Sequence, residues 1–454
     1  MDKKPTIFMT VYDGLITKNI LRTDVFPLVR EKAAMVLFCA PDKLEYYRSE
    51  FGADDVVVEV TPQRTYPRLE AFFWTLSFHS IPTESVRILT ARRYFEIKKK
   101  GALVYFMKRV LHVLGHVKLW RMFLRGLYRL VPDRSFDAFF QIHNPTLIFT
   151  PNMVSDEDMR LLKAAKRHNV RNVGMMKSWD NLNTKAYVSV QPDVFIAQNK
   201  IVKDDMINLI DYPENKIELT GFPQWDIYTH HEVLLPRVEF ARRLNLDPNK
   251  KIILYAAAGD TLAPKDTEVM RALFDYIATG KLGDVQVLLR PHPKYMAHEE
   301  QFADLPFVCV DRPGKVITKG KYGSWEFEEA DIVHLMNSFA HTDVIVNTAS
   351  STCIEATMFD LPNVSIAYDG DSTVPYEISV KSFYDFECIK ALMEPGGIIK
   401  ANNFSELTEG IRVFLEDPSH LQAERKKTFE KECYRHDGKA GERIAHILLR
   451  ELSQ

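Results

Sequence analysis

Apolar residues along the chain fall into short continuous runs that alternate with longer amphipathic stretches. A first series of runs occupies residues 6–11, 35–40, 56–60, 146–150 and 172–176. A second series occupies residues 194–198, 217–220, 252–258, 285–290, 307–310, 343–347 and 363–368. Apolar runs of this length predict strands that are buried on both faces. The stretches between them, such as 42–51 and 156–168, have helical spacing and predict helices.

The alternation of strands and helices predicts an α/β fold, because crossover connections build parallel sheets. Two series of strands predict two doubly wound, Rossmann-like domains that face a cleft. We expect an amino-terminal domain over residues 1–188 and a carboxyl-terminal domain over 189–418. Helices over 419–454 are expected to pack back across the junction. Ligands of open parallel sheets bind at the carboxyl ends of the strands, so functional residues are expected in the loops that follow the runs.

The composition narrows the class of protein without naming its activity. The 454 residues carry a formal net charge of −2, which does not favour a nucleic-acid binder. The five cysteines include no CxxC pair and predict neither a disulfide framework nor a zinc site. We therefore expect a reducing, cytoplasmic location. The sequence shows no amino-terminal signal segment and no apolar run near the 18 residues that a spanning helix needs.

Hydroxyl groups follow run 343–347, where a helix is predicted to begin. Ser350, Ser351 and Thr352 stand at this turn, and Glu355 lies one helical turn later. The first N–H groups of a helix are unpaired and carry partial positive charge, which suits a phosphate. Glu355 can accept hydrogen bonds from ribose hydroxyls. Such residues also occur as ordinary helix caps, so the segment by itself leaves both interpretations open.

Two other strand ends carry candidate ligand contacts. Run 285–290 ends in Arg290, and His292 follows between two prolines. An arginine can hold a phosphate through two donors, and His292 can donate to the same group. A solvated arginine at a strand end is the alternative. Gly259, after run 252–258, permits close approach of the backbone to a ligand, although an ordinary turn has the same composition.

The loop after run 172–176 is dense in polar groups. It contains Lys177, Asp180, Asn181 and Lys185. Asp180 can take the proton of an attacking hydroxyl and is the candidate general base. The other three are candidates for contact with an acceptor or another anion. A polar interdomain loop would look the same, because Asp and Asn favour turns.

Asp369 and Asp371 stand on either side of Gly370 in the sequence. Two carboxylates this close can hold a divalent cation. The central glycine is typical of a turn, and a three-residue match is frequent by chance. We therefore expect a turn here and no metal site.

Residues 97–131 contain no Asp or Glu. Nine cations lie in this segment, namely Lys98, Lys99, Lys100, Lys108, Arg109, Lys118, Arg121, Arg125 and Arg129. The last three recur every four residues and form one helical stripe. Basic, aromatic-rich amphipathic helices can lie in a membrane interface, so we expect Lys118, Arg121, Arg125 and Arg129 to contact an anionic membrane. A core helix pair with a solvated basic face, or a docking site for an anionic acceptor, would show the same pattern.

Together these motifs resemble a known family. Segment 290–293 (RPHP), the hydroxylated turn and Leu361-Pro362 resemble the donor-binding domain of GT-B glycosyltransferases. Segment 437–444 (DGKAGERI) resembles the closing helix of the CDP-glycerol glycerophosphotransferase-like and capsule-polysaccharide transferase group. The resemblance covers residues 170–450. It implies a nucleotide diphosphate near Arg290 and a catalytic contribution from His292, with the 350–352 turn capping the diphosphate and Glu355 near the ribose.

The chain departs from that group at one position. The group has a Trp-His-Gly stretch after the last strand of its first domain, and that histidine looks catalytic. Here the matching residues are Trp179-Asp180-Asn181. Aspartate keeps a proton acceptor, and the exchange favours a sugar donor over a polyol phosphate. We expect a cofactor-free, metal-independent and inverting glycosyltransferase, which moves a sugar from a nucleotide-sugar to a bacterial surface glycan or lipid-linked acceptor. Such an enzyme would act as a peripheral protein at the inner face of the plasma membrane.

Three alternatives stay open at this point. The chain can be a CDP-glycerol-type polyol phosphotransferase, or a nucleotide-sugar 2-epimerase-like enzyme that needs neither acceptor nor membrane. It can also be a scaffold that binds a nucleotide-sugar without catalysis.

Overall fold

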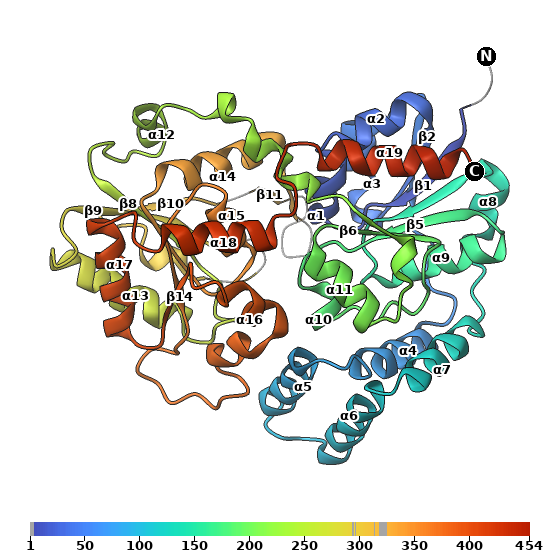
Figure 1. The fold of residues 1–454 in the computed structure, drawn as a ribbon, viewed down its shortest axis with the longest axis horizontal. Helices are drawn as coiled ribbons and strands as arrows, with labels where there is room; N and C mark the ends of the chain where they lie inside the picture. Colours follow the sequence, from blue (N-terminus) through green and yellow to red (C-terminus); the bar gives the residue numbers. More distant parts are fainter. Residues whose placement is uncertain (1–3, 293–294, 296, 313, 317–324) are drawn as a thin grey trace. The chain divides into compact units, whose positions relative to one another are not determined.

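The computed structural model describes residues 4–292, 295, 297–312, 314–316 and 325–454. They form two compact units, whose elements are labelled in Figure 1. Unit 1 contains the described residues of Met1–Thr229, Val316–Glu326 and Tyr434–Gln454. Unit 2 contains those of His230–Lys315 and Phe327–Cys433.

Unit 1 is built on a seven-stranded sheet in which all neighbouring strands are parallel. In spatial order its strands are β3 (Val56–Val60), β2 (Ala34–Cys39), β1 (Thr6–Thr10), β4 (Leu147–Thr150), β5 (Arg171–Met175), β6 (Val194–Ala197) and β7 (Ile217–Leu219). The sheet therefore grows outward from β1 in one direction and from β4 in the other.

Unit 2 repeats this plan with six parallel strands. In spatial order they are β10 (Val308–Val310), β9 (Val285–Arg290), β8 (Lys251–Ala256), β13 (Val344–Asn347), β14 (Asn363–Ile366) and β15 (Ile399–Ala401). The short strands β11 (Lys315–Val316) and β12 (Trp325–Glu326) pair with each other apart from both sheets.

Both sheets are covered on two faces, as the continuous apolar runs predict. In β1, Ile7 and Met9 share one core with Ile444, whereas Phe8 packs with Phe140 in a core on the other face. All three β1 side chains are fully buried. The predicted class, two doubly wound α/β domains, is confirmed.

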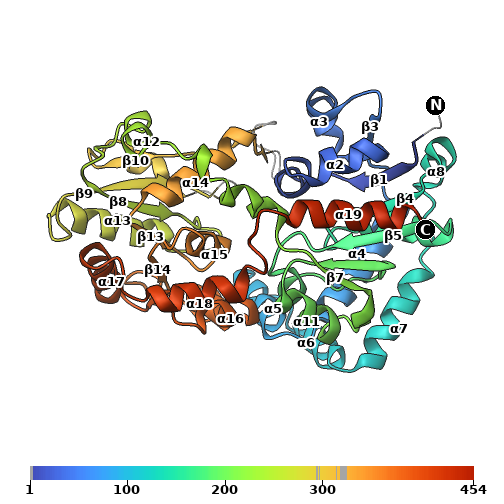
Figure 2. The same cartoon turned by 45° about the horizontal axis from the view of Figure 1, so that its top comes forward.

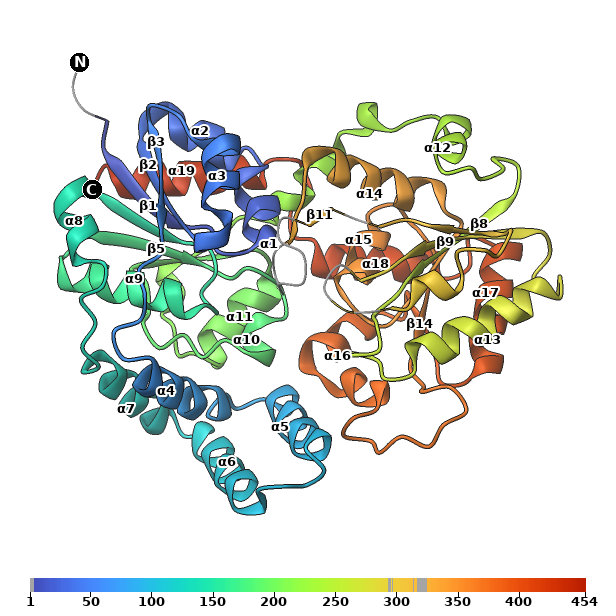
Figure 3. The same ribbon diagram turned by 180° about the vertical axis from the view of Figure 1, so that it is seen from behind.

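The helices of unit 1 lie around its sheet and in a separate group formed by α4–α7 (Figures 1 and 3). Their bounds are α1 (Gly14–Ile16), α2 (Val25–Lys32), α3 (Leu44–Phe51), α4 (Pro67–His79), α5 (Glu84–Glu96), α6 (Ala102–Gly115), α7 (Lys118–Arg129), α8 (Asp137–His143), α9 (Asp156–Arg167), α10 (Asn181–Thr184), α11 (Lys200–Asn208) and α19 (Ala440–Leu452). Shorter helical turns are η1 (Thr17–Leu21), η2 (Pro41–Lys43), η3 (Glu214–Lys216) and η4 (Pro223–Thr229).

The helices of unit 2 cover its sheet in the same way (Figure 2). They are α12 (Arg237–Arg243), α13 (Asp266–Ala278), α14 (Glu329–His341), α15 (Ser351–Thr357), α16 (Glu387–Met393), α17 (Phe404–Glu416) and α18 (Gln422–Glu432). Shorter turns are η5 (His231–Val233), η6 (Glu299–Gln301) and η7 (Val380–Asp385).

Unit 1 extends beyond the predicted boundary near residue 188. Strands β6 and β7, which the sequence analysis placed at the start of the second domain, pair with β5 and with each other in the first sheet. Their apolar character predicts buried strands correctly, but it carries no information about which sheet they join.

The last helix, α19, belongs to unit 1 and packs against α2. Asp226 fixes its start by accepting the Gly441 N–H at 2.7 Å and the Ala440 N–H at 3.1 Å. Gly438 precedes it with a φ of +70°, and an added Cβ would lie 2.5 Å from the Thr229 hydroxyl. The DGKAGERI segment thus supplies the backbone by which α19 docks on its own unit.

None of the helices in the described ranges is long and apolar enough to cross a membrane.

Candidate functional site

The strand order of unit 2 reverses between β8 and β13, which are neighbours in the sheet. Loops leave these two strands in opposite directions at their carboxyl ends, and open α/β sheets bind ligands in the crevice formed there. Residues 257–260 follow β8, residues 348–350 follow β13, and Arg290 ends the adjacent strand β9. Three of the predicted binding segments therefore meet at one edge of one sheet.

Asn347, the last residue of β13, holds the loop that follows this strand. Its Oδ1 accepts the Ser365 hydroxyl at 3.2 Å and the Cys353 thiol at 3.3 Å, and its Nδ2 donates to Thr352 Oγ1 at 3.3 Å. Ser350 and Thr352 share a hydrogen bond of 2.7 Å between their hydroxyl oxygens. Ser350 is the N-cap residue of α15, yet its side chain makes no capping hydrogen bond. The turn therefore presents partly exposed hydroxyls at 350–352 rather than a closed cap.

Thr348, which the sequence analysis passed over, lies in the same loop. Its side chain is buried, and its hydroxyl has no hydrogen-bond partner among the described residues. A buried hydroxyl without a partner is costly, so Thr348 is a candidate donor for a ligand. Glu355, expected near the ribose, is also buried, within α15.

The loop after β8 is organised by Asp266, the first residue of α13. Its carboxylate accepts the Tyr255 hydroxyl at 2.9 Å and the Gly259 N–H at 2.8 Å. Burial raises the pKa of Asp266 to about 6, although the Gly259 N–H opposes the shift. Gly259 has a φ of +79°, which explains why glycine stands there. Its N–H is used within the loop, so Gly259 contributes shape rather than a donor.

Arg290 is buried and ion-paired at the end of β9. Its Nη1 lies 2.5 Å from Asp311 Oδ2, and His334 Nε2 lies 2.9 Å from the other oxygen of that carboxylate. Burial alone would raise the pKa of Asp311, but the His334 hydrogen bond and the Arg290 charge hold it below its usual range. Asp311 and His334, neither of which the sequence pattern indicated, thus hold the Arg290 guanidinium in place at the edge that carries the hydroxylated turn.

His292 lies two residues beyond Arg290. Its Nδ1 accepts the Tyr295 N–H at 3.2 Å, and the two rings lie 4.5 Å apart. A neutral imidazole whose Nδ1 accepts carries its proton on Nε2.

The Asp369–Asp371 turn behaves as expected of a turn. Asp369 is buried and accepts the Val380 N–H at 3.1 Å and the Ser379 hydroxyl. Gly370 has a φ of +60°. The Asp369 carboxylate is thus engaged in holding the following segment.

Asp180 lies in unit 1, in the loop between β5 and α10. Its Oδ1 accepts the Asn181 amide at 3.0 Å, and its Oδ2 lies 3.2 Å from both Thr184 Oγ1 and Lys185 Nζ. Burial would raise the pKa of Asp180, but the Lys185 charge and the Ser178 hydrogen bond lower it. Asp180 is therefore ionised at neutral pH. Asn181 is fully buried and holds this loop, whereas the Lys185 side chain is 43% exposed.

Lys177 forms an ion pair that local sequence could not predict. Its Nζ lies 2.7 Å from Asp13 Oδ2, and its carbonyl accepts the Asn19 amide at 2.8 Å. Asp13 follows β1, while Lys177 follows β5. Asp13 and Asn19 were missed because only the strand order brings the two loops to the same edge.

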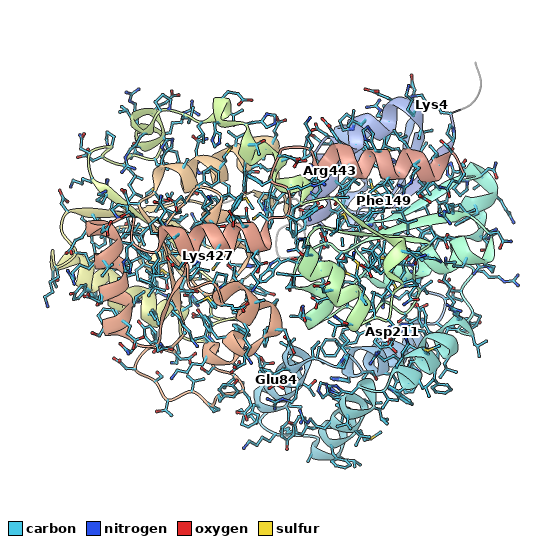
Figure 4. All side chains as sticks on the ribbon, viewed as in Figure 1. Lys4, Glu84, Phe149, Asp211, Lys427 and Arg443 are labelled. Carbon is cyan, nitrogen blue, oxygen red and sulfur yellow. The ribbon has the colours of Figure 1, made fainter. Side chains whose placement is uncertain are left out.

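Two of the four predicted membrane contacts, Arg121 and Arg125, are corrected by the structure. Arg121 and Arg125 are buried, and both pair with Asp211, a residue marked in Figure 4, at 2.7 and 3.2 Å. These two arginines face the protein because a carboxylate some ninety positions away packs against α7. Lys118 and Arg129 are exposed.

Solved structures with the same fold span nearly the whole chain. A UDP-GlcNAc 2-epimerase from Neisseria meningitidis, bound to UDP-GlcNAc, aligns with a TM-score of 0.56 at 9% identity, over 98% of this chain and all of its own. A Staphylococcus aureus MnaA–UDP complex gives 0.56 at 12% identity, over 99% and 98%. The wall teichoic acid polymerase TagF gives 0.52 at 13% identity, over 99% and 89%. At these identities the likeness shows the GT-B fold alone.

No curated protein matches the chain in sequence. The family model for CDP-glycerol:poly(glycerophosphate) glycerophosphotransferases matches residues 164–450, which is more than half of the chain. The match confirms the resemblance of the RPHP and DGKAGERI segments. With the fold, it identifies a transferase of GT-B type, and the chain belongs to the CDP-glycerol:poly(glycerophosphate) glycerophosphotransferase family.

Proposed function

We propose that the protein moves a sugar from a nucleotide-sugar donor to a hydroxyl of a bacterial surface glycan or lipid-linked acceptor. The observation that carries the proposal is the edge of unit 2, where a fixed cation, an unpartnered hydroxyl and the 350–352 hydroxyls surround the strand-order reversal. These groups suit the two phosphates of a leaving nucleoside diphosphate. Arg290 and His292 would stabilise the charge that develops on it, and Glu355 would serve the ribose side. This route requires neither a cofactor nor a metal.

Asp180 is the base in this proposal. Its ionised carboxylate, steered by Asn181, Thr184 and Lys185, would accept the proton of the attacking hydroxyl in an inverting displacement. Lys177 and Lys185 would orient an anionic acceptor. Asp180→Asn should lower kcat by roughly 10²–10⁴-fold while donor affinity stays unchanged. Full turnover by this variant would remove Asp180 from the mechanism.

A second candidate, transfer of a polyol phosphate from a CDP-activated donor, is favoured by the family match. The two reactions release different nucleotides. Attack on the sugar carbon frees a nucleoside diphosphate, whereas attack on the donor phosphorus frees CMP.

Incubation with UDP-sugars and CDP-glycerol, followed by chromatography of the nucleotide products, separates the two candidates. Acceptor-dependent release of a nucleoside diphosphate supports sugar transfer. Release of CMP establishes the second candidate instead. Conversion of UDP-GlcNAc without any acceptor would show an epimerase and overturn both.

We also propose that unit 1 docks on an anionic membrane through α6 and α7, from the cytoplasmic side. The exposed apolar side chains there include Leu103 (73%), Phe106 (63%), Val113 (64%), Leu119 (75%), Phe123 (58%) and Leu130 (77%). Such a surface is unusual for a soluble monomer. Exposed Lys98, Lys99, Lys100, Lys118 and Arg129 flank it, and no carboxylate lies in residues 97–131. This charge favours an anionic bilayer as the occupant.

Sedimentation with phosphatidylglycerol vesicles tests the membrane contact. The pair Leu119→Ser and Phe123→Ser should release the protein, and phosphatidylcholine vesicles should bind it weakly. The matched control is the pair Val57→Ser and Val238→Ser, two exposed apolar positions outside these helices. Equal sedimentation of both variants would contradict the proposal.

A further inference from the structure

A basic pocket lies in unit 1, apart from the strand-end loops described above. It has a volume of about 680 Å³ and lies among the end of α7, the end of α9, residues 190–193 and residues 212–216. These segments precede β6 and β7 or follow α7 and α9, so the pocket lies toward the amino-terminal ends of the strands. Figure 3 shows the chain running from the end of α7 to α8, alongside α9. Donor sites of open sheets lie at the opposite, carboxyl edge.

The pocket carries an excess of positive charge. Its cations are Arg129, Arg134, Lys163, Lys166, Arg167 and Lys216, and its carboxylates are Asp133 and Asp193. Both carboxylates are already used by the protein. Asp133 pairs with the buried Arg160 at 3.0 Å, and Asp193 accepts the Asn172 amide at 2.7 Å and pairs with Lys166.

The cations differ in how they are compensated. Lys163 is buried and donates to the Tyr128 carbonyl at 3.0 Å, while Arg167 pairs with Asp137. In the part of the chain that the structure describes, Arg129, Arg134 and Lys216 form no ion pair. Three cations from two separate segments, 129–134 and 212–216, thus line one pocket and form no ion pair with the described residues there.

We propose that this basic pocket binds a phosphate-bearing ligand, with Arg134 and Lys216 as direct contacts and Lys163 at its base. A pocket of this volume is in the range of small-ligand sites. Arginine holds phosphate through paired N–H donors, and lysine supports it as a point charge. Leu130, which is 77% exposed, is one of the lining residues and directly follows α7, so the pocket adjoins the exposed apolar side chains of that helix. The phosphate can therefore come from a lipid headgroup or from a soluble phosphorylated molecule.

Calorimetry with glycerol phosphate, and flotation with phosphatidylglycerol or phosphatidylcholine vesicles, test the pocket in the full chain. We expect the wild-type protein to bind glycerol phosphate or phosphatidylglycerol vesicles. The double variant Arg134→Glu, Lys216→Glu should bind the same probe about tenfold more weakly or worse, because charge-assisted contacts are lost. The matched control is Lys32→Glu, an exposed lysine that precedes β2 on the other half of the same sheet. It should leave affinity within about twofold, since it removes no contact.

The two arms identify the source of the phosphate. Variant-sensitive binding of phosphatidylglycerol vesicles, without binding of free glycerol phosphate, assigns a headgroup. Variant-sensitive binding of free glycerol phosphate assigns a soluble ligand. The proposal is overturned if the wild-type protein binds neither probe, or if the double variant binds like Lys32→Glu. Donor turnover, measured separately, should be unchanged in the double variant, so failure of the pocket and failure of the proposed transfer are told apart.

Discussion

The two units share a strand order, but different side chains lie where that order reverses. In unit 1 the reversal lies between β1 and β4, and the buried Asp158 of α9 joins both sides. Its carboxylate accepts the Thr10 hydroxyl at 2.9 Å and the Asn152 N–H at 3.1 Å. In unit 2 the buried acid Asp266 begins α13, the helix after β8, and it holds Tyr255 and Gly259, which both lie on the β8 side.

The fold offers two equivalent edges, and their side chains differ. The edge of unit 2 is the one that we propose to bind an anion. In unit 1 the Asp158 side chain bridges the reversal point and uses donors from both loops. In unit 2 the hydroxyls at 348–352 and the Arg290 guanidinium lie at the same edge of the sheet. Each prediction below changes one side of this comparison.

The largest effect is expected at the ion pair of unit 2. Arg290→Ala leaves the buried Asp311 without its permanent counter-charge and with only the His334 hydrogen bond, which should lower the free energy of unfolding by about 3–5 kcal/mol. Denaturant unfolding measures this loss. The neighbouring Arg312, which is 62% exposed, serves as the control, and Arg312→Ala should cost about 0–1 kcal/mol.

Stability and ligand binding can be separated at this pair. Removing both charges in Arg290→Ala, Asp311→Ala should recover most of the lost stability and still leave weak donor binding. Wild-type donor affinity in the double variant would contradict a role for Arg290 in holding the diphosphate.

The next effect concerns pH and the acids at the two edges. Burial raises the pKa of Asp158 to about 7 and that of Asp266 to about 6. Between the ordinary carboxyl value near ~3.9 and these values, the unfolded chain binds fewer protons than the folded one. The contribution of each acid to stability is therefore present at low pH and is lost as pH rises, by at most about 1.4 kcal/mol per pH unit.

Unfolding free energies of the wild type, Asp158→Asn and Asp266→Asn, measured from acid to neutral pH, test this assignment. The difference between wild type and Asp158→Asn should change until about pH 7, and that for Asp266→Asn until about pH 6. Parallel curves for wild type and variants would show that neither acid keeps its proton in the folded state.

The smallest effect is expected from two matched threonines. Thr348→Val removes an unpartnered hydroxyl from unit 2, so stability should hold while donor affinity falls by about 0.5–1.5 kcal/mol, roughly two- to tenfold. Thr10→Val removes a donor to Asp158 in unit 1, so stability should fall by about 1–3 kcal/mol while donor affinity holds. Thermal unfolding and calorimetry with the donor nucleotide measure both quantities. The comparison of the two edges fails if the variants show the reverse pattern.

The sequence by itself determined the α/β class, nearly all strand positions and the segments that end at a carboxyl edge, because burial on two faces and local turn chemistry leave a pattern in neighbouring residues. Arg290, His292 and the 350–352 hydroxyls were predicted as site residues in this way. The tertiary structure alone decided that β6 and β7 join the first sheet and that Arg121 and Arg125 turn inward to Asp211. It also decided that Asp158 bridges the two loops at the edge of unit 1, whereas Thr348 has no hydrogen-bond partner among the described residues at the edge of unit 2. These outcomes depend on partners that are far apart in the chain. The periodicity of one segment shows which side chains will be buried, but it does not identify the residues against which they will pack.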